Sequence, residues 1–334
     1  MQVIILSAGM GIRLKPITNE KPKCLVNVCS KPILQHQIDY FFNDDRIDEI
    51  IIVIGYMADL IRNLIKTFYN DDPKIILIEN KDFLTTNNMY SLFLTRNYIK
   101  NSFLLVNGDV ILNPEITNEL IKFPPENAIA VDIGQYYKES MKVIQKGDLL
   151  IDISKKINKK DALGSSIDFY KFSKKGKDIF FSKMEEIIIK RKNANQWTEV
   201  AIQELLNNKT LEMKAFDIKG KAWVEIDNFN DLYEAEIKFN NNISKLKEKK
   251  VLLCDSIMRS SYTAYNHYKI LKGKNVSKQY FITMIFNHLF FNKIISKEIS
   301  DLYYCPLLYW NEDFRKKFQK FKQPREVLTN LRDQ

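Results

Sequence analysis

Short apolar runs alternate with helix-length segments through the first half of the chain. Each run has four to six residues and is rich in isoleucine and valine, which is typical of strands buried on both faces. This alternation predicts an α/β fold with a mainly parallel sheet and helices on both sides. We expect strands at Val3–Leu6, Glu49–Ile54, Ile75–Ile78, Phe103–Val106 and Ala128–Val131, and helices at Pro32–Phe42, Ala58–Tyr69, Asn88–Arg96 and Pro114–Phe123.

The pattern changes near residue 141, where shorter strand-like runs follow one another. They predict a β-rich excursion over the ligand-binding edge of the sheet, made of Met141–Gln145, Leu149–Ile153 and Ser165–Tyr170. Helical spacing then returns, and the last helix of this part closes a first domain at residues 1–247. The expected elements are helices at Gly176–Arg191 and Trp197–Asn207, a strand at Met213–Asp217 and a helix at Phe229–Lys247.

Residues 251–334 differ from the preceding part in composition and pattern, and they are expected to form a helical, basic, aromatic-rich module. They hold 14 Lys and Arg against 7 Asp and Glu, so most of the chain's net charge of +10 lies there. Such a module can serve as a homodimer interface, a lid or an anchor on a membrane face, or it can simply pack on the first domain. The excess of lysine also fits an ordinary solvated surface.

Composition narrows the class of protein. A chain of 334 residues with 45% hydrophobic and 28% charged residues can bury a full core. It has no 18-residue uncharged apolar run and no evident signal peptide, so we expect a cytoplasmic protein without a transmembrane segment. The four cysteines show no CxxC pair and are expected to be reduced thiols. We find no nucleic-acid-binding motif and expect no nucleic-acid partner.

A loop of small residues follows the first strand directly. Glycines at two positions, one residue apart, let backbone N–H groups approach phosphate oxygens, and a nearby arginine and lysine supply positive charge. This arrangement suits a nucleoside triphosphate. The candidate nucleotide-binding residues are Leu6, Ala8, Gly9 and Gly11, and the candidate catalytic cations are Arg13 and Lys23.

The whole string resembles the signature of the sugar-nucleotidyltransferase superfamily, LAAGxGxRLxPLTxxxPKxLxxVxxKP. This chain has Ser7 where the signature has its first alanine, and it keeps Pro16, Lys31 and Pro32. The resemblance implies a Rossmann-like domain of the nucleotide-diphospho-sugar transferase type. It also implies transfer of a nucleotidyl group from a nucleoside triphosphate to a phosphorylated acceptor, with release of pyrophosphate. Arg13 would reach the β and γ phosphates, and Lys23 would contact phosphate.

Two aspartates are candidate ligands of Mg²⁺. Asp109 follows an apolar strand and a glycine, and a carboxylate at that place is suited to a hard cation. An isolated aspartate after a strand is more often a helix cap. However, Asp109 and Asp227 both match metal aspartates of the superfamily, so the resemblance favours a role as metal ligands over a role as helix caps. Glu225 alternates with Asp227 and can point the same way.

The segment from Glu79 to Leu92 bears on the choice of base. Sugar-directed relatives have a Gly-Thr-Ala-like turn here, and this chain has Asn-Asn-Met-Tyr-Ser-Leu instead. That form resembles the branch that uses CTP on small phosphorylated acceptors, typified by phosphocholine cytidylyltransferases and including glutamine-phosphate and aminophosphonate enzymes. A hexose 1-phosphate enzyme is the alternative within the superfamily. The candidate nucleotide-binding residues here and at the strand end are Asn87, Asn88, Ser91 and Asn107.

The acceptor site is less defined. Lys155 and Lys156 lie where sugar-directed members carry Glu-Lys-Pro, and one of them is expected to contact the acceptor phosphate, with Lys156 preferred as a catalytic residue. Glu199 or Glu139 can bind an ammonium group, and aromatic rings can surround a choline head. Phosphocholine, inositol phosphate, aminophosphonates and glutamine phosphate all remain open as acceptors. The candidate acceptor-binding residues are Lys142, Lys155, Glu199 and Trp223.

Two other classes of protein are less consistent with these residues. A catalytically silent regulatory subunit usually lacks a metal aspartate or the signature arginine, and this chain keeps both. A glycosyltransferase of the GT-A type needs Asp-x-Asp at the strand end, where this chain has Asn107-Gly108-Asp109.

Overall fold

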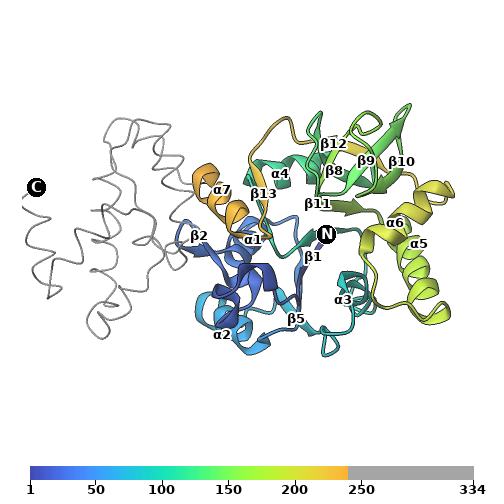
Figure 1. The fold of residues 1–334 in the computed structure, drawn as a ribbon. Coiled ribbons are helices and arrows are strands. Elements are labelled where there is room, and N and C mark those ends of the chain that lie inside the picture. Colours follow the sequence, from blue (N-terminus) through green and yellow to red (C-terminus); the bar gives the residue numbers. More distant parts are fainter. Residues whose placement is uncertain (240–334) are drawn as a thin grey trace, which may run out of the picture. The chain divides into compact units, whose positions relative to one another are not determined.

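The computed structural model describes residues 1–239, and its centre is a nine-stranded mixed sheet (Figure 1). Its strand order is β10-β9-β11-β6-β1-β4-β5, with β8 and β12 attached beside β11. Four neighbouring strands are parallel and confirm the predicted α/β fold: β1 (Gln2–Ser7), β4 (Glu49–Ile54), β5 (Ile75–Glu79) and β6 (Phe103–Asn107).

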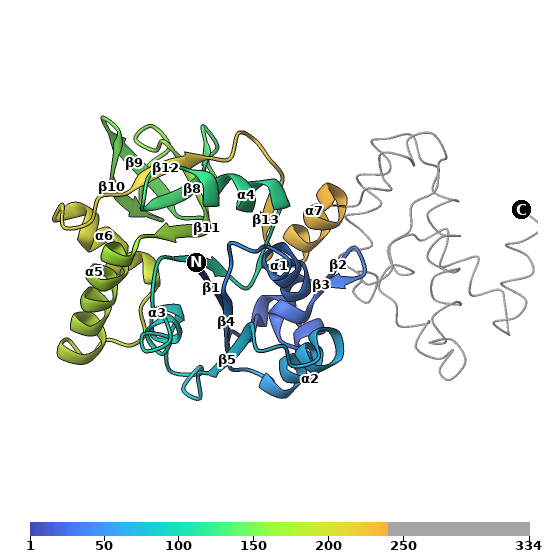
Figure 2. The same ribbon diagram turned by 180° about the vertical axis from the view of Figure 1, so that it is seen from behind.

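Alternate residues of β1 face two separate hydrophobic cores, which is why the run is apolar at every position. Val3 and Ile5 pack with α1 (Ile33–Phe42), α2 (Ala58–Tyr69) and α4 (Pro114–Lys122). Ile4 and Leu6 pack on the opposite face with α3 (Asn88–Phe93), α5 (Lys174–Glu185) and α6 (Thr198–Asn207). Figure 2 shows these two groups of helices on the two sides of the sheet.

The β-rich part is continuous with the main sheet. The strands β9 (Lys142–Lys146), β10 (Leu149–Ser154) and β11 (Gly164–Phe172) are antiparallel, and β11 also pairs with β6 and with β8 (Ala128–Ile133). β12 (Lys214–Asp217) runs parallel to β8. The three predicted strands of the excursion are therefore confirmed, and they extend the sheet rather than forming a separate layer.

Helix boundaries follow local capping. Asn113 accepts a hydrogen bond from the backbone of Glu115 and precedes Pro114, so α4 begins there. Ser173 caps α5 in the same way, three residues before the predicted start. That helix then changes to a wider π turn at Glu186–Lys190. α3 ends at Phe93, earlier than the expected Arg96.

Short elements complete the described part. The loop after β1 contains 3₁₀ turns at Ile12–Leu14, Ile17–Asn19 and Lys23–Leu25, followed by a small hairpin of β2 (Asn27–Val28) and β3 (Lys31–Pro32). A separate two-stranded ladder joins β7 (Val110–Leu112) to β13 (Trp223–Glu225), and α7 spans Phe229–Phe239.

Some expectations fall on residues that the structure does not describe. The end of the helix predicted at 229–247, the domain boundary and the module at 251–334 all lie outside residues 1–239, as do Cys254 and Cys305. Cys24 and Cys29, in the described part, are free thiols. None of the described helices combines the length and the apolar character needed to cross a bilayer.

Candidate active site

The loop after β1 is shaped by contact between Gly11 and Lys23. Gly11 has a left-handed backbone with φ of 67°, and a Cβ atom built there would lie 2.6 Å from the Cβ of Lys23. Only glycine satisfies both conditions without strain. Thr18 Oγ1 donates a hydrogen bond of 2.9 Å to the Gly11 carbonyl and fixes the loop over the lysine. The signature glycine thus brings Lys23 directly beneath the loop that carries Arg13.

Asp109 lies in a tight turn between β6 and β7. The N–H of Gly108 donates to the Leu6 carbonyl at 2.8 Å, and a Cβ atom on Gly108 would come within 2.4 Å of Ser7 Oγ. The missing side chain therefore lets the turn approach the end of β1. As a result, Asp109 projects beside the opening loop, at the carboxyl edge of the parallel strands, where ligands bind in sheets of this kind.

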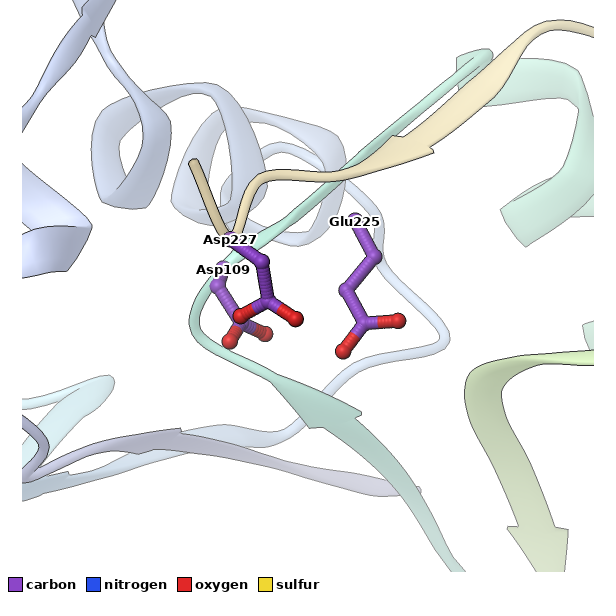
Figure 3. Close-up of side chains that lie close together, drawn as sticks. All are labelled: Asp109, Glu225 and Asp227. Carbon is purple, nitrogen blue, oxygen red and sulfur yellow. The ribbon is translucent and has the colours of Figure 1, made fainter. Parts of the chain in front are cut away.

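Backbone pairing brings Asp227 next to Asp109. Val110 pairs with Glu225 in the β7–β13 ladder, and the Ile226 N–H donates to the Asp109 carbonyl at 2.9 Å. The carboxylates of Asp109 and Asp227 therefore lie side by side although they are far apart in sequence, with Glu225 next to them (Figure 3).

Two cations hold these aspartates. Lys23 Nζ lies 2.5 Å from Asp109 Oδ2 and 2.7 Å from Asp227 Oδ1, and Arg13 lies 2.7 Å from Asp227. Burial by itself would lower the pKa of Lys23, but the two carboxylates raise it above its ordinary value. Burial would likewise raise the pKa of Asp227, but Lys23 and Arg13 bring it below its ordinary value. Lys23 and Asp227 therefore favour their charged forms in this pair.

The carboxylates fit a divalent cation of the magnesium type. Ligand oxygens of Asp109, Glu225 and Asp227 lie within 4.8 Å of one another. Asp109 Oδ1 is buried and has no hydrogen-bond partner among residues 1–239, so it remains available as a ligand. Mg²⁺ prefers such oxygen ligands and binds through one or two carboxylates together with substrate phosphates.

These groups form one side of a cavity of about 460 Å³, a size typical of small-ligand sites. Phe83 and Asn80 also face it, although sequence reasoning did not select them. The lining includes most of the residues that the sequence selected: Leu6, Ala8, Gly9, Gly11, Arg13, Lys23, Asn87, Asn88, Ser91, Asn107, Asp109, Lys155, Glu199 and Asp227.

The two candidate asparagines of α3 also have structural contacts. Asn87 caps the helix by accepting a hydrogen bond from the N–H of Asn88, and Asn88 Oδ1 accepts from the N–H of Thr198 at 2.9 Å. Asn80 is buried and donates to Ser91 Oγ at 3.0 Å. These hydrogen bonds hold the polar side chains of this part of the cavity lining in place.

Three candidate residues lie outside the cavity lining. Lys142 is fully buried, with Nζ donating to the Lys138 carbonyl at 3.0 Å. Trp223 is buried, and its Nε1 donates to Asp132 at 2.9 Å. Lys156 is exposed, whereas Lys155 lines the cavity with Nζ 4.9 Å from the centre of the Trp197 ring. The geometry therefore favours Lys155 over Lys156, and gives Lys142 and Trp223 structural contacts instead.

A further acidic group in the cavity lining was largely missed from the sequence. Tyr170 Oη donates to Glu199 at 2.8 Å and lies 3.1 Å from Asp168, which also accepts from Asn107 at 3.0 Å. Burial, followed by the nearby charges of Glu199 and Asp109, raises the pKa of Asp168 to about 8. Asp168 has a left-handed φ of 55° in the irregular part of β11. The one available signal was a charged residue inside an apolar strand.

Glu225 belongs to the same acidic region. Burial, then the charges of Asp168, Asp109 and Asp227, raise its pKa well above the ordinary value. Among residues 1–239, Asp168, Glu199 and Glu225 form no ion pair with a basic side chain. The cavity thus has a basic side at Arg13 and a group of carboxyl side chains that form no ion pair among the described residues.

A glycine loop, paired carboxylates and cations at the carboxyl edge of a parallel sheet define a nucleotide-binding α/β protein. A family model described as nucleotidyl transferase matches residues 2–242, and the chain belongs to this family. This family agrees with the resemblance carried by the opening motif.

Several relatives are known by name. A bifunctional protein GlmU of Methanococcus maripaludis is 30% identical over 254 residues, which cover 75% of this chain and 57% of that protein. Choline-phosphate cytidylyltransferase of Streptococcus pneumoniae is 26% identical, covering 71% and 97% of the two chains. CTP:phosphoglutamine cytidylyltransferase of Campylobacter jejuni is 27% identical, covering 70% and 98%.

The fold has solved counterparts. The structure of the CTP:phosphocholine cytidylyltransferase LicC from Streptococcus pneumoniae superposes with a TM-score of 0.58 at 23% identity, covering 71% of this chain and 97% of that one. The likeness confirms the Rossmann-like fold of the nucleotidyltransferase domain.

Proposed function

We propose that this protein transfers a cytidylyl group from CTP to a small phosphorylated acceptor that carries a positive charge, as phosphocholine does. The observation that carries the proposal is the cavity's division into a basic side and an acidic region without a matching cation. An acceptor with a phosphate at one end and an ammonium group at the other matches both. Glutamine phosphate, which also has an amino group, is the alternative acceptor.

The acidic region supports a cationic acceptor for an electrostatic reason. Asp168, Glu199 and Glu225 line one cavity, and the raised pKa values of Asp168 and Glu225 show that their negative charges are costly when nothing balances them. A bound ammonium group would lower that cost and favour the ionised carboxylates. A neutral sugar would provide no such compensation.

CTP as the donor is supported by relatives and by the local sequence. Two relatives with nearly full-length coverage are named as cytidylyltransferases. The Asn80–Ser91 pair offers polar groups at the wall where a base would lie. Because these two relatives are named as cytidylyltransferases, cytosine is the first base to test.

The reaction itself needs little from the protein beyond alignment and charge. An oxygen of the acceptor phosphate forms a bond to the α-phosphorus of CTP, and the bond from that phosphorus to the bridging oxygen of the β-phosphate breaks, releasing pyrophosphate. Arg13 and Lys23 would neutralise charge on the triphosphate. Lys155 would hold the acceptor phosphate. No proton has to be removed from the acceptor, because its phosphate oxygen is already anionic.

Asp109 and Asp227 are the residues that would hold Mg²⁺, with Glu225 close enough to contribute. When bound, the ion would polarise the phosphoryl oxygens and neutralise developing charge. The carboxylates of Asp109 and Asp227 would then be shared between the ion and Lys23, which contacts both of them in this structure.

A pyrophosphate-release assay tests the proposal. Phosphocholine, phosphoethanolamine, 2-aminoethylphosphonate, glutamine phosphate and glucose 1-phosphate are each supplied with CTP and with UTP. We expect turnover with CTP and an amino or ammonium acceptor. Turnover confined to glucose 1-phosphate would refute the cationic acceptor, and equal rates with UTP would refute the choice of base.

A matched pair of variants on α6 tests the acidic region. Glu199→Gln should raise KM for the cationic acceptor about tenfold, as expected for a lost contact worth roughly 1.4 kcal/mol, and leave KM for CTP unchanged. Glu204→Gln removes a carboxylate on the same helix that pairs with Arg191 on the surface, and should change neither constant. Equal effects of the two substitutions would contradict the role of Glu199.

A further inference from the structure

A buried glutamine on α1 contacts the turn that carries Asp109. Gln37 is 1% exposed, and its Nε2 donates to the Asn107 carbonyl at 2.7 Å and to the Val110 carbonyl at 2.8 Å. These carbonyls lie immediately before and after the Gly108-Asp109 pair. One side chain thus closes the turn from the side opposite to β1.

The orientation of the Gln37 amide follows from its surroundings. Its Oε1 is buried and has no hydrogen-bond partner among residues 1–239. Reversing the amide would place that oxygen against two carbonyl oxygens, so the amide nitrogen must face the turn. A buried oxygen without a partner costs free energy, which a leucine or methionine at this place would avoid. The two donated hydrogen bonds are therefore the feature that distinguishes glutamine here.

Asp109 depends on its backbone for position. Its Oδ1 has no partner in the described part of the chain, and its Oδ2 contacts the flexible end of Lys23. The backbone is held by three contacts: the Gly108 N–H on Leu6, the Ile226 N–H on the Asp109 carbonyl, and the two bonds from Gln37. Of these, the bonds from Gln37 are the ones made by a side chain.

The same helix also contacts the lysine segment. α1 packs on the 3₁₀ turn Lys23–Leu25 and on β7, and the Ile33 N–H donates to the Val26 carbonyl at 3.0 Å. Gln37 lies one helical turn after Ile33. α1 therefore contacts both the segment that carries Lys23 and the turn that carries Asp109. Gln37 makes the hydrogen bonds between the helix and that turn.

We propose that Gln37 is a positioning residue that fixes the Asp109 turn and thereby sets the affinity of the site for a divalent cation. This inference rests on the proposed role of Asp109 as a metal ligand. Gln37 does not touch the substrate or the cation; it acts through the two carbonyls. Loss of its donors frees the turn, and a carboxylate that moves by a fraction of an ångström binds the cation less tightly.

The test compares Gln37→Met with a matched control at Lys171. Lys171 is also buried, and its Nζ donates to two backbone carbonyls, those of Ile121 at 3.2 Å and Phe123 at 2.7 Å, away from the cavity. Lys171→Met removes the same kind of contact. Binding of Mn²⁺ to the full chain is followed by electron paramagnetic resonance, with and without CTP, together with the melting temperature and the Mg²⁺ concentration that gives half-maximal turnover.

We expect Gln37→Met to weaken Mn²⁺ binding by roughly tenfold and to raise the half-maximal Mg²⁺ concentration by a similar factor. Lys171→Met should lower the melting temperature without changing either cation measurement. Gln37→Glu, which keeps the length but lacks the donors when ionised, should resemble Gln37→Met. Cation measurements for Gln37→Met that match those for Lys171→Met would overturn the inference.

An Asp109→Asn arm separates this inference from the proposed function. If Asp109→Asn binds Mn²⁺ as the wild type does, the metal site itself is wrongly assigned. If Asp109→Asn loses the ion and Gln37→Met keeps it, the metal site stands and the role of Gln37 fails.

Discussion

Replacing Lys23 with methionine should destabilise the protein in the absence of metal. The substitution leaves Asp109 and Asp227 facing each other, with Arg13 alone beside Asp227. Breaking a fully buried ion pair costs about 3–5 kcal/mol, and an exposed pair contributes less than about 1 kcal/mol. The side chains of Lys23 and Asp227 are 13% and 12% exposed, so we expect a loss of about 2 kcal/mol.

Magnesium should reverse most of this loss. In Lys23→Met, a divalent cation takes the place of the ammonium group between the carboxylates, and at 100 times its dissociation constant it would stabilise the fold by about 2.7 kcal/mol. In the wild type the gain is smaller, because Lys23 already balances part of the charge of the two carboxylates. Thermal unfolding in EDTA measures the loss of stability caused by the substitution, and unfolding in saturating MgCl₂ measures the gain from the cation in each protein.

The control variant is Lys21→Met, two positions away, where the lysine forms no ion pair among the described residues. It should melt like the wild type in both buffers. The reasoning is refuted if Lys23→Met melts like the wild type in EDTA, or if MgCl₂ raises the melting temperature of both proteins by the same amount.

Three further substitutions have distinct expected outcomes. Asp109→Asn should abolish pyrophosphate release while circular dichroism shows an intact fold; retained turnover would remove Asp109 from the metal site. Lys155→Met should raise KM for the acceptor about tenfold, whereas Lys156→Met should leave it unchanged, because Lys155 lines the cavity and Lys156 does not. Asp168→Asn should alter the pH dependence of stability. The Asp168 carboxyl, whose pKa rises from 3.8 to about 8 on folding, favours the folded state below pH 4 and loses that contribution as the pH rises to 8. Unfolding free energy should therefore fall more steeply in the wild type, by up to about 1.4 kcal/mol per pH unit, and a slope unchanged in the variant would contradict the assignment.

The parallel core and the shape of the loop after β1 could be predicted because local sequence determines them. The strands are apolar at every position, since both faces are buried, and Gly11 is needed wherever the loop must cross Lys23. Asp109 follows a strand in a sheet whose carboxyl edge binds ligands, so its place in the cavity was also predictable. Such features depend on a few neighbouring residues.

The acidic region and the lysine choice depend on long-range packing, which no local pattern encodes. Asp168 lines the cavity from the part of β11 where the register with β8 shifts, between Ser166 and Tyr170. Lys155 and Lys156 are adjacent and identical in chemistry, and only the fold distinguishes them, by placing Lys155 in the cavity lining and leaving Lys156 exposed. Trp223 was a candidate for contact with the acceptor, but its indole is buried and donates a hydrogen bond to Asp132.

The site has two kinds of residue, and they should respond differently to mutation. Gly108 and Gln37 make contacts that also hold β1, β6 and β7 together, so substitutions there should change stability and cation affinity in parallel. Lys155 lines the cavity without being part of either hydrophobic core, whereas Glu199 also accepts the buried hydrogen bond from Tyr170. Under the proposed function, acceptor preference should therefore change at Lys155 with a smaller loss of stability than a change at Gly108 or Gln37 would cause. Such a difference would let one fold serve relatives with different named acceptors.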